Sequence, residues 1–257
     1  MDDDVDTQLD VLGRLGIRYL EMRTAWGKKA ADLSDREIER LAAACRKRST
    51  RVSCIGSRIG KSPITEPLES SLGELGRILD LAEGLDTKLV RIFSFRPPAG
   101  REAEHVDESL SRLKALAEVA GARGVVLVME NETGMVGDIP ERCRTLLQGV
   151  DSQSLRFVWD IGNFPHSGVD RAVDRGWPLL GQYVAHVQVK DTRLADRAMT
   201  VAGAGDGQAL ELLGKLRDAG YRGFLALEPH LANGAEGMER AARALRGLMG
   251  DAGCTES

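Results

Sequence analysis

The segment VVLVMENETGMVGDIPERCRTLLQGVDSQSLRFVWD, residues 125–160, contains one complete strand–helix–strand repeat. Its apolar runs at 125–130 and 156–160 have the length and composition of buried strands, and the stretch 138–150 between them has the length of a helix. Apolar strands separated by a helix are typical of a parallel sheet that is covered by helices. The segment therefore predicts an α/β fold.

The same alternation extends from this segment to both ends of the chain. It indicates strands at 17–23, 51–58, 88–95, 125–130, 156–160, 184–191 and 223–229. It indicates helices at 5–16, 33–48, 67–86, 105–124, 138–150, near 169–180, at 209–220 and at 234–250. Ser34 with Glu37 three residues later predicts a capping box at the start of the second helix. No low-complexity linker interrupts the pattern, so we expect one domain over residues 1–257.

The number of strands is one short of a complete barrel. A chain of 257 residues is close to the usual length of a (β/α)8 TIM barrel, about 250 residues. Seven strands are recognisable, however, and the first element is a helix preceded by MDDDVD, a poor strand former. We therefore expect a (β/α)8 TIM-barrel type fold that lacks its first strand, with a gap in the wall beside the first helix.

Composition and charge exclude several classes of protein. The net charge is −4 and the chain has no broad basic stripe, which argues against a nucleic-acid partner. No apolar run approaches 18 residues and the amino terminus is acidic, so we expect neither a membrane span nor a signal peptide. The four cysteines are scattered without a C-x-x-C motif, as expected of reduced thiols. These features predict a cytoplasmic protein.

Four polar residues end four of the apolar runs: Glu130, Asp160, Gln188 and Glu228. A polar group at the end of a buried parallel strand is costly unless it has a function. In a barrel, the carboxyl ends of the strands converge on the active site. Three carboxylates and one amide form an oxygen-rich set that suits Mg²⁺ or Mn²⁺. The sequence therefore predicts a single divalent-metal site, although a helix cap or a salt bridge would explain any one of these residues alone.

Other polar residues near the expected barrel mouth are candidates for substrate binding. Each also has an ordinary structural explanation as a surface charge, a helix-end partner or a buried histidine. Lys190 has the strongest position, directly after the HVQV run. The glycine-rich GAGDG at 203–207 lacks the form of a phosphate-binding loop, so we expect a flexible loop over the mouth. The candidate set is His186, Lys190, Arg193, His166, Lys61 and, as a polar wall residue, Glu21.

Several segments together resemble the sugar phosphate isomerase/epimerase family, the xylose isomerase-like TIM barrels. They are LGIRYLEMR, WDIGN, HVQVKD, GAGDG and GYRGFLALEP, which occur in the order and spacing of the family. The resemblance implies a divalent metal (Mg, Mn or Zn) held by Glu130, Asp160, Gln188 and Glu228. Many members have His-x-His where this chain has His186-Val187-Gln188, and members similar to hydroxypyruvate isomerase have His-x-Gln.

The chemistry implied by the resemblance is proton transfer next to a carbonyl group. Glu130 and Glu228 are then expected to be the acid/base pair that moves the proton through an enediolate. An isomerase or epimerase of a small sugar, a sugar phosphate or a hydroxy-carbonyl compound is the first expectation, and such barrels often form homo-oligomers. The alternatives are a dehydratase similar to inosose dehydratase, an AP-endonuclease-like enzyme, and a non-catalytic sugar-binding barrel.

Overall fold

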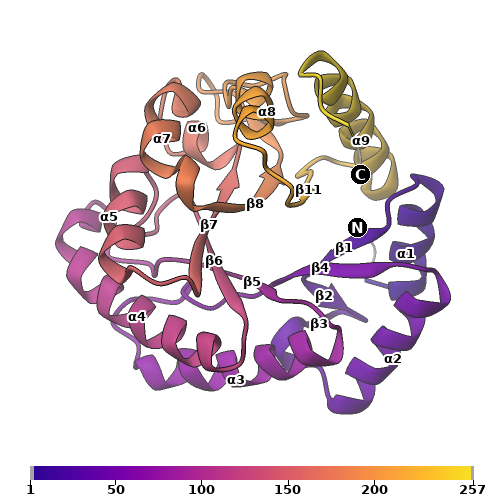
Figure 1. Ribbon diagram of the computed structural model, residues 1–257, viewed down its shortest axis with the longest axis horizontal. Coiled ribbons are helices and arrows are strands. Elements are labelled where there is room, and N and C mark those ends of the chain that lie inside the picture. The colour runs from indigo at the N-terminus through magenta and orange to yellow at the C-terminus, as the bar shows by residue number, and fades with distance from the viewer. Residues whose placement is uncertain (1–2, 256–257) are drawn as a thin grey trace.

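The computed structural model describes residues 3–255, and its central feature is a seven-stranded parallel sheet. The sheet curls into a nearly closed barrel with helices on its outside (Figure 1). The strands, in their order across the sheet, are β1 (Tyr19–Met22), β4 (Arg51–Gly56), β5 (Leu89–Ile92), β6 (Val126–Glu130), β7 (Leu155–Asp160), β8 (Val184–Val189) and β11 (Leu225–Leu227). The predicted TIM barrel with one strand missing is confirmed.

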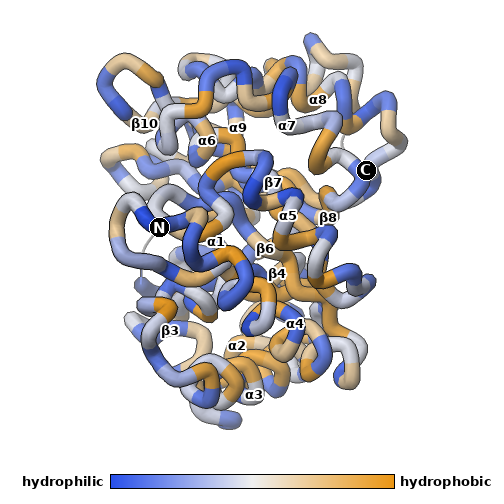
Figure 2. The backbone as a smooth tube through the Cα atoms, turned by 90° about the vertical axis from the view of Figure 1, so that its left-hand side faces the viewer, coloured by the Kyte–Doolittle hydropathy of each residue, from blue (hydrophilic) through white to orange (hydrophobic). Residues whose placement is uncertain are grey.

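Helix α1 (Val5–Arg14) precedes the first strand, and the other helices follow strands in sequence; together they cover the outer face of the sheet. The predicted helix near 169–180 is present as α7 (Ala172–Leu180) and is preceded by an additional short helix, α6 (Asn163–His166). The capping box of α2 (Asp35–Lys47) is confirmed, because the side chains of Ser34 and Glu37 each accept a hydrogen bond from the backbone N–H of the other residue. Hydropathy alternates along α2 and α3, as expected of helices with one buried face (Figure 2). The helices are α1 (Val5–Arg14), α2 (Asp35–Lys47), α3 (Leu68–Gly84), α4 (Val106–Ala122), α5 (Pro140–Val150), α6 (Asn163–His166), α7 (Ala172–Leu180), α8 (Ala209–Asp218) and α9 (Gly234–Asp251).

The loops between these strands and helices contain several short elements of secondary structure. Two antiparallel pairs lie after β1 and β8: β2 (Thr24–Ala25) with β3 (Lys28–Lys29), and β9 (Asp191–Thr192) with β10 (Met199–Thr200). Three 3-10 turns are η1 (Ala30–Asp32), η2 (Glu102–His105) and η3 (Gly181–Tyr183). The two antiparallel pairs follow the carboxyl ends of β1 and β8. They therefore form part of the rim at which the active site of a barrel lies.

Apolar packing occurs in two separate layers. The larger cluster fills the space between the sheet and the helices, and a small cluster of Cys54, Val128 and Val158 lies apart from it. Val128 precedes Glu130 by two residues and Val158 precedes Asp160 by two, so each pair shares one face of its strand. The small cluster is therefore the interior of the barrel, and both acidic residues point to the same side.

The barrel wall is open between β1 and β11, where no backbone pairing joins the two strands among residues 3–255. A cavity of ≈ 800 Å³ occupies this region and is lined by both strands. Side chains bridge it instead of a strand: the rings of Tyr19 and Phe224 lie 4.8 Å apart, and Arg23 forms an ion pair with Glu228. The predicted gap is thus present, and its position beside α1 is visible in Figure 1.

Within the described part of the chain, no helix combines the length and the apolar character needed to span a bilayer.

Candidate active site

Three carboxylates from three strands converge at the rim of the barrel. Glu130 and Asp160 are the last residues of β6 and β7, and Glu228 directly follows β11. One oxygen of each lies within 4.8 Å of the others. Glu130 and Asp160 are buried, and the side chain of Glu228 is 13% exposed. The parallel strands bring these residues together because each acidic residue occupies the equivalent carboxyl end.

Lys190 lies among these carboxylates. Its Nζ is 2.6 Å from Oδ2 of Asp160 and 3.0 Å from Oε2 of Glu228. The lysine side chain is only 4% exposed, so its charge is neutralised by the carboxylates and not by water. Lys190, predicted as a residue of the mouth, is therefore a direct partner of two members of the cluster.

The sequence did not predict two further partners of Glu130. Arg91 on β5 places its Nε 3.2 Å from Oε2 of Glu130, and both side chains are buried. Asn163, the first residue of α6, donates a hydrogen bond from Nδ2 to Oε1 of Glu130 at 2.8 Å. The available signal was an arginine inside the apolar run KLVRIFSF, since a charge in a buried strand needs a partner.

Burial and neighbouring charges shift the pKa values of the carboxylates in different directions. Burial raises the pKa of Glu130 to about 8, against the opposing charge of Arg91. Burial raises the pKa of Asp160 to about 7, although Lys190 lowers it. Burial also acts to raise the pKa of Glu228, but the charge of Lys190 and other cations hold it well below its usual range. Glu130 and Asp160 therefore hold a proton more readily than Glu228 does.

Gln188 contacts a different acidic residue from the three of the cluster. Its Nε2 donates to Oε1 of Glu21 at 2.7 Å, and Nε2 of His186 lies 2.8 Å from the other oxygen of Glu21. The carbonyl oxygen of Gln188 is buried and has no hydrogen-bond partner in the described structure. The amide nitrogen therefore binds Glu21, and the role of Gln188 as a metal ligand stays a prediction.

The donor atoms of the cluster fit a divalent cation. Buried oxygens of Glu130, Asp160 and Gln188 (Oε2, Oδ2 and Oε1) lack hydrogen-bond donors among the described residues, although Arg91 and Lys190 lie at ion-pair distance from the first two. Carboxylate and amide oxygens are the ligands that Mg²⁺ and Mn²⁺ prefer. Oε1 of Gln188 is therefore an unpartnered oxygen that a cation would satisfy, whereas at Glu130 and Asp160 a cation would compete with Arg91 and Lys190.

The remaining predicted substrate residues, Lys61, Arg193 and His166, lie outside the contacts of the carboxylate cluster. Lys61 pairs with Glu132 at 2.7 Å, and Arg193 pairs with Asp196 at 2.7 Å. His166 is the last residue of α6 and is half-buried. In residues 3–255, none of the three hydrogen-bonds to Glu130, Asp160 or Glu228, so the structure does not join them directly to the cluster.

The glycine-rich loop at 203–207 is anchored by a carboxylate. Asp191 accepts hydrogen bonds from the backbone N–H groups of Gly203, Gly205 and Gly207, at 3.0, 3.2 and 2.9 Å. It also accepts from the N–H of Thr192 at 2.8 Å. Four backbone donors thus converge on one buried side chain directly after Lys190, which anchors a loop that the sequence predicted to be flexible.

Sequence comparison connects the chain to known proteins. The profile of the family described as "Xylose isomerase-like TIM barrel" matches residues 9–248. An uncharacterized protein of Methanocaldococcus jannaschii is 27% identical over 129 residues, 49% of this chain and 44% of that protein. The 2-epi-5-epi-valiolone 7-phosphate 2-epimerase of an Actinoplanes species is 30% identical over 146 residues, 56% of this chain and 51% of the enzyme. The matches thus span about half the length of these relatives.

Comparison of structures shows the same fold at low sequence identity. The probable 3-DHS dehydratase AsbF of Bacillus anthracis has a TM-score of 0.77 at 18% identity, covering 93% of this chain and 92% of that one. The IOLI protein with a bound zinc atom has a TM-score of 0.77 at 16% identity, covering 97% and 92%. A Mycobacterium smegmatis barrel in complex with magnesium has a TM-score of 0.72 at 18% identity, covering 95% and 89%.

Proposed function

Because the chain belongs to the xylose isomerase-like TIM barrel family, we propose that it is a divalent-metal-dependent isomerase or epimerase. Its substrate is a small sugar, a sugar phosphate or a hydroxy-carbonyl compound. The observation that carries the proposal is the convergence of Glu130, Asp160 and Glu228, whose oxygens lie within 4.8 Å of one another at the barrel rim. The similarity over about half the length of the valiolone phosphate epimerase supports it.

Glu130, Asp160, Glu228 and the carbonyl oxygen of Gln188 are the proposed metal ligands. A bound Mg²⁺, Mn²⁺ or Zn²⁺ supplies Lewis-acid polarisation of a substrate carbonyl, which acidifies the neighbouring C–H. The similar structures that hold zinc or magnesium support a metal in a barrel of this shape. The three carboxylates come from three different strands and surround a common point, and a metal there would compete with Lys190 for Asp160 and Glu228.

Glu130 and Glu228 are the proposed acid/base pair. They belong to strands on different sides of Asp160 in the sheet and therefore reach a substrate from two directions. One removes a proton next to the carbonyl, and the other returns a proton to a neighbouring carbon or to the opposite face. The ammonium of Lys190, held between Asp160 and Glu228, is suited to bind an oxygen that gains negative charge.

The other proposed substrate residues would act at the edges of the site. Lys61 and Arg193 belong to loops that follow strands at the carboxyl rim, and His166 ends the short helix α6 after β7. Glu21 and His186 lie deeper, where they bind each other, and are proposed to form the polar floor. A substrate with a phosphate or carboxylate group would use the basic members of this set.

The experiment is carbon–hydrogen exchange in D₂O with Mn²⁺ or Mg²⁺ present, followed by proton NMR on a panel of ketoses, their phosphates and hydroxypyruvate. We expect deuterium incorporation next to the carbonyl of at least one compound. Glu130→Gln and Glu228→Gln should each reduce exchange by about 10²–10⁴-fold, the usual contribution of a general acid or base. Glu141→Gln, which changes an exposed ion pair with Arg175, is the matched control. Wild-type exchange in both site variants would refute the assignment.

A second candidate is a dehydratase of a polyol ketone. Its support is the similarity of the fold to the probable 3-DHS dehydratase AsbF, with a TM-score of 0.77. The early proton removal is common to both reactions, but here a hydroxyl group leaves after enolisation. Mass spectrometry of the products separates the two, because loss of water identifies a dehydratase and an unchanged mass identifies an isomerase or epimerase.

A further inference from the structure

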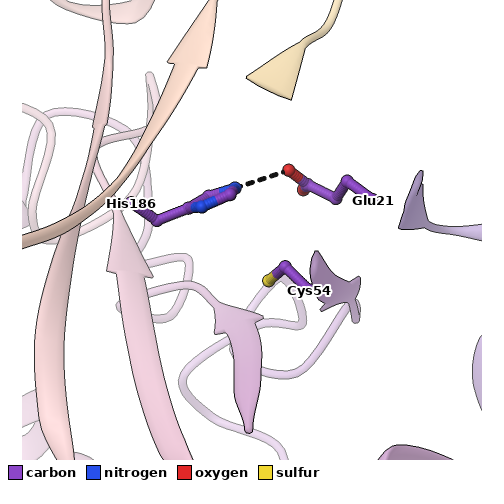
Figure 3. Close-up of side chains that lie close together, drawn as sticks. All are labelled: Glu21, Cys54 and His186. Carbon is purple, nitrogen blue, oxygen red and sulfur yellow. Dashed lines mark hydrogen bonds and ion pairs between the residues drawn. The ribbon is translucent and has the colours of Figure 1, made fainter. Parts of the chain in front are cut away.

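A second group of ligand-type side chains lies deeper in the barrel than the carboxylate cluster. It consists of Glu21 on β1, Cys54 on β4 and His186 on β8, and Figure 3 shows the three side chains turned toward one another. One ligand atom of each lies within 4.8 Å of the others. His186 precedes Gln188 by two residues, so the group forms the next layer down on the same face of β8.

The spacing of the three atoms is near that of a tetrahedral zinc site. Zinc binds nitrogen and oxygen at about 2.0–2.2 Å and sulfur at about 2.3 Å, which places tetrahedral ligand atoms roughly 3.3–3.8 Å apart. Nε2 of His186 and Oε2 of Glu21 are 2.8 Å apart, and no pair of the group exceeds 4.8 Å. Side-chain movements of about 1 Å or less would therefore bring all three to an ion.

Unsatisfied buried atoms point independently to a missing ligand. His186 is 0% exposed, and its Nδ1 has no hydrogen-bond partner among the described residues. The thiol of Cys54 is also 0% exposed, and it donates a long hydrogen bond of 3.7 Å to the carbonyl oxygen of Ile55. Buried polar atoms are nearly always paired, so a buried imidazole whose Nε2 contacts Glu21 and whose Nδ1 has no partner can give a nitrogen to an ion.

An ion can reach this group through the open wall of the barrel. Glu21 lines the ≈ 800 Å³ cavity between β1 and β11, and its side chain is 11% exposed. The same cavity provides space for a water molecule as an additional ligand. The route from solvent therefore does not pass through the carboxylate cluster.

We propose that Glu21, Cys54 and His186 bind a zinc-type transition-metal ion at a second site. A thiolate, a carboxylate and a neutral imidazole balance the two charges of the ion and favour Zn²⁺ or Co²⁺ over Mg²⁺. Burial keeps the pKa of the free thiol well above its usual value, so binding releases the thiol proton to solvent. The site does not depend on the proposed enzymatic activity.

The second site would also connect the two sides of the open wall from inside the barrel. β8 and β1 lie on opposite sides of the gap, because β11 pairs with β8 and β1 pairs with β4. An ion held by Glu21 and His186 joins β1 to β8 across the position of the absent pairing. Zn²⁺ should therefore raise the melting temperature through this site, since a ligand that binds only the folded state stabilises it.

The test is Co²⁺ titration of the full, metal-free chain, followed by absorption spectroscopy. We expect a thiolate-to-cobalt charge-transfer band in the near ultraviolet that saturates at one ion per chain. Asp160→Asn should keep this band, because that residue belongs to the carboxylate cluster, and Cys45→Ser should keep it because Cys45 lies on α2. Cys54→Ser should remove the band.

Absence of the band in the wild-type protein, or its persistence in Cys54→Ser, overturns the proposal. If circular dichroism shows that Cys54→Ser is unfolded, Glu21→Gln replaces it as the deciding variant. This change keeps the thiol and the size of the side chain but removes the charge, and should weaken Co²⁺ binding at least 10-fold. Unchanged affinity in folded Glu21→Gln also overturns the proposal. The exchange activity with Mg²⁺ is measured separately, so the proposed enzymatic function and the proposed second metal site can each be refuted without the other.

Discussion

The ammonium of Lys190 lies 2.6 Å from Oδ2 of Asp160, with both side chains at least 96% buried. The pair is desolvated, so each charge depends on the other for its stability. Lys190 thus acts as an internal cation at the point where the three carboxylates meet.

Replacing Lys190 with Met should make the folded protein depend on an added metal ion. The change leaves the buried carboxylate of Asp160 without its cation, which should lower the free energy of unfolding in EDTA by about 3–5 kcal/mol. Mn²⁺ should restore part of the loss and bind more tightly than to the wild type, because no ammonium competes for Asp160 and Glu228. Urea unfolding with and without Mn²⁺ measures both effects.

The control for this prediction is Lys114→Met, at an exposed position on α4. It should change the free energy of unfolding by at most about 0.5 kcal/mol. Equal stability of the two variants in EDTA would contradict the role of Lys190.

Gly205→Ala should destabilise the anchored loop. An added Cβ would lie 2.5 Å from Oδ1 of Asp191 and 2.7 Å from the carbonyl oxygen of Thr192. We expect a loss of about 1–3 kcal/mol, typical of forced overpacking, and a reduced rate in the exchange assay. Gly214→Ala on α8 is the matched control, since its Cβ meets nothing within 4 Å and should stabilise the helix by about 0.5–1 kcal/mol. An unchanged free energy of unfolding in Gly205→Ala would refute the packing argument.

The capping box of α2 should lose its contribution to stability in acid. The hydrogen bond from Lys28, followed by those from Ser34, lowers the pKa of Glu37 to about 2. A lowered folded-state pKa means that this contribution is complete above the unfolded value of about 4.3 and disappears as the pH falls through about 2. NMR titration of the carboxyl carbon measures the pKa of Glu37 directly.

Ser34→Ala tests the cause of that shift. It removes the hydroxyl partner of Glu37 but keeps Lys28, which is 2.7 Å from Oε1. The pKa of Glu37 should therefore rise, yet remain below its ordinary value. An unchanged pKa of Glu37 in this variant would mean that the serine hydroxyl does not lower that pKa.

Backbone hydrogen exchange should be faster at the open edge of the barrel than at its centre. β11 pairs with β8 alone, its three residues are half-buried, and it borders the cavity. β7 pairs on both sides and is mostly buried. We expect the amides of Leu225–Leu227 to exchange at least about 10-fold faster than those of Leu155–Asp160, because local opening needs less free energy there. Mass spectrometry of peptic peptides compares the two strands, and equal protection would show that side chains close the wall fully.

Much of the candidate site could be predicted because it depends on local pattern and topology. Glu130 and Asp160 end apolar runs, and parallel strands place their carboxyl ends at one rim. Arg91 illustrates what was missed. It lies inside an apolar run with no local indication of its partner, and its contact with Glu130 depends on the register between β5 and β6.

The sequence by itself determined the barrel, the absence of one strand and the rim at which the carboxylates meet. These follow from hydrophobic periodicity, which acts over a few residues, and from the way parallel strands are connected. Only the tertiary structure decided the partners inside the barrel: Glu21 meets His186 although 165 residues separate them, and Gln188 turns its amide toward the same carboxylate. The physical reason is that a buried polar group takes whichever donor or acceptor the curvature and register of the sheet bring within about 3 Å, and that geometry is set by the whole barrel.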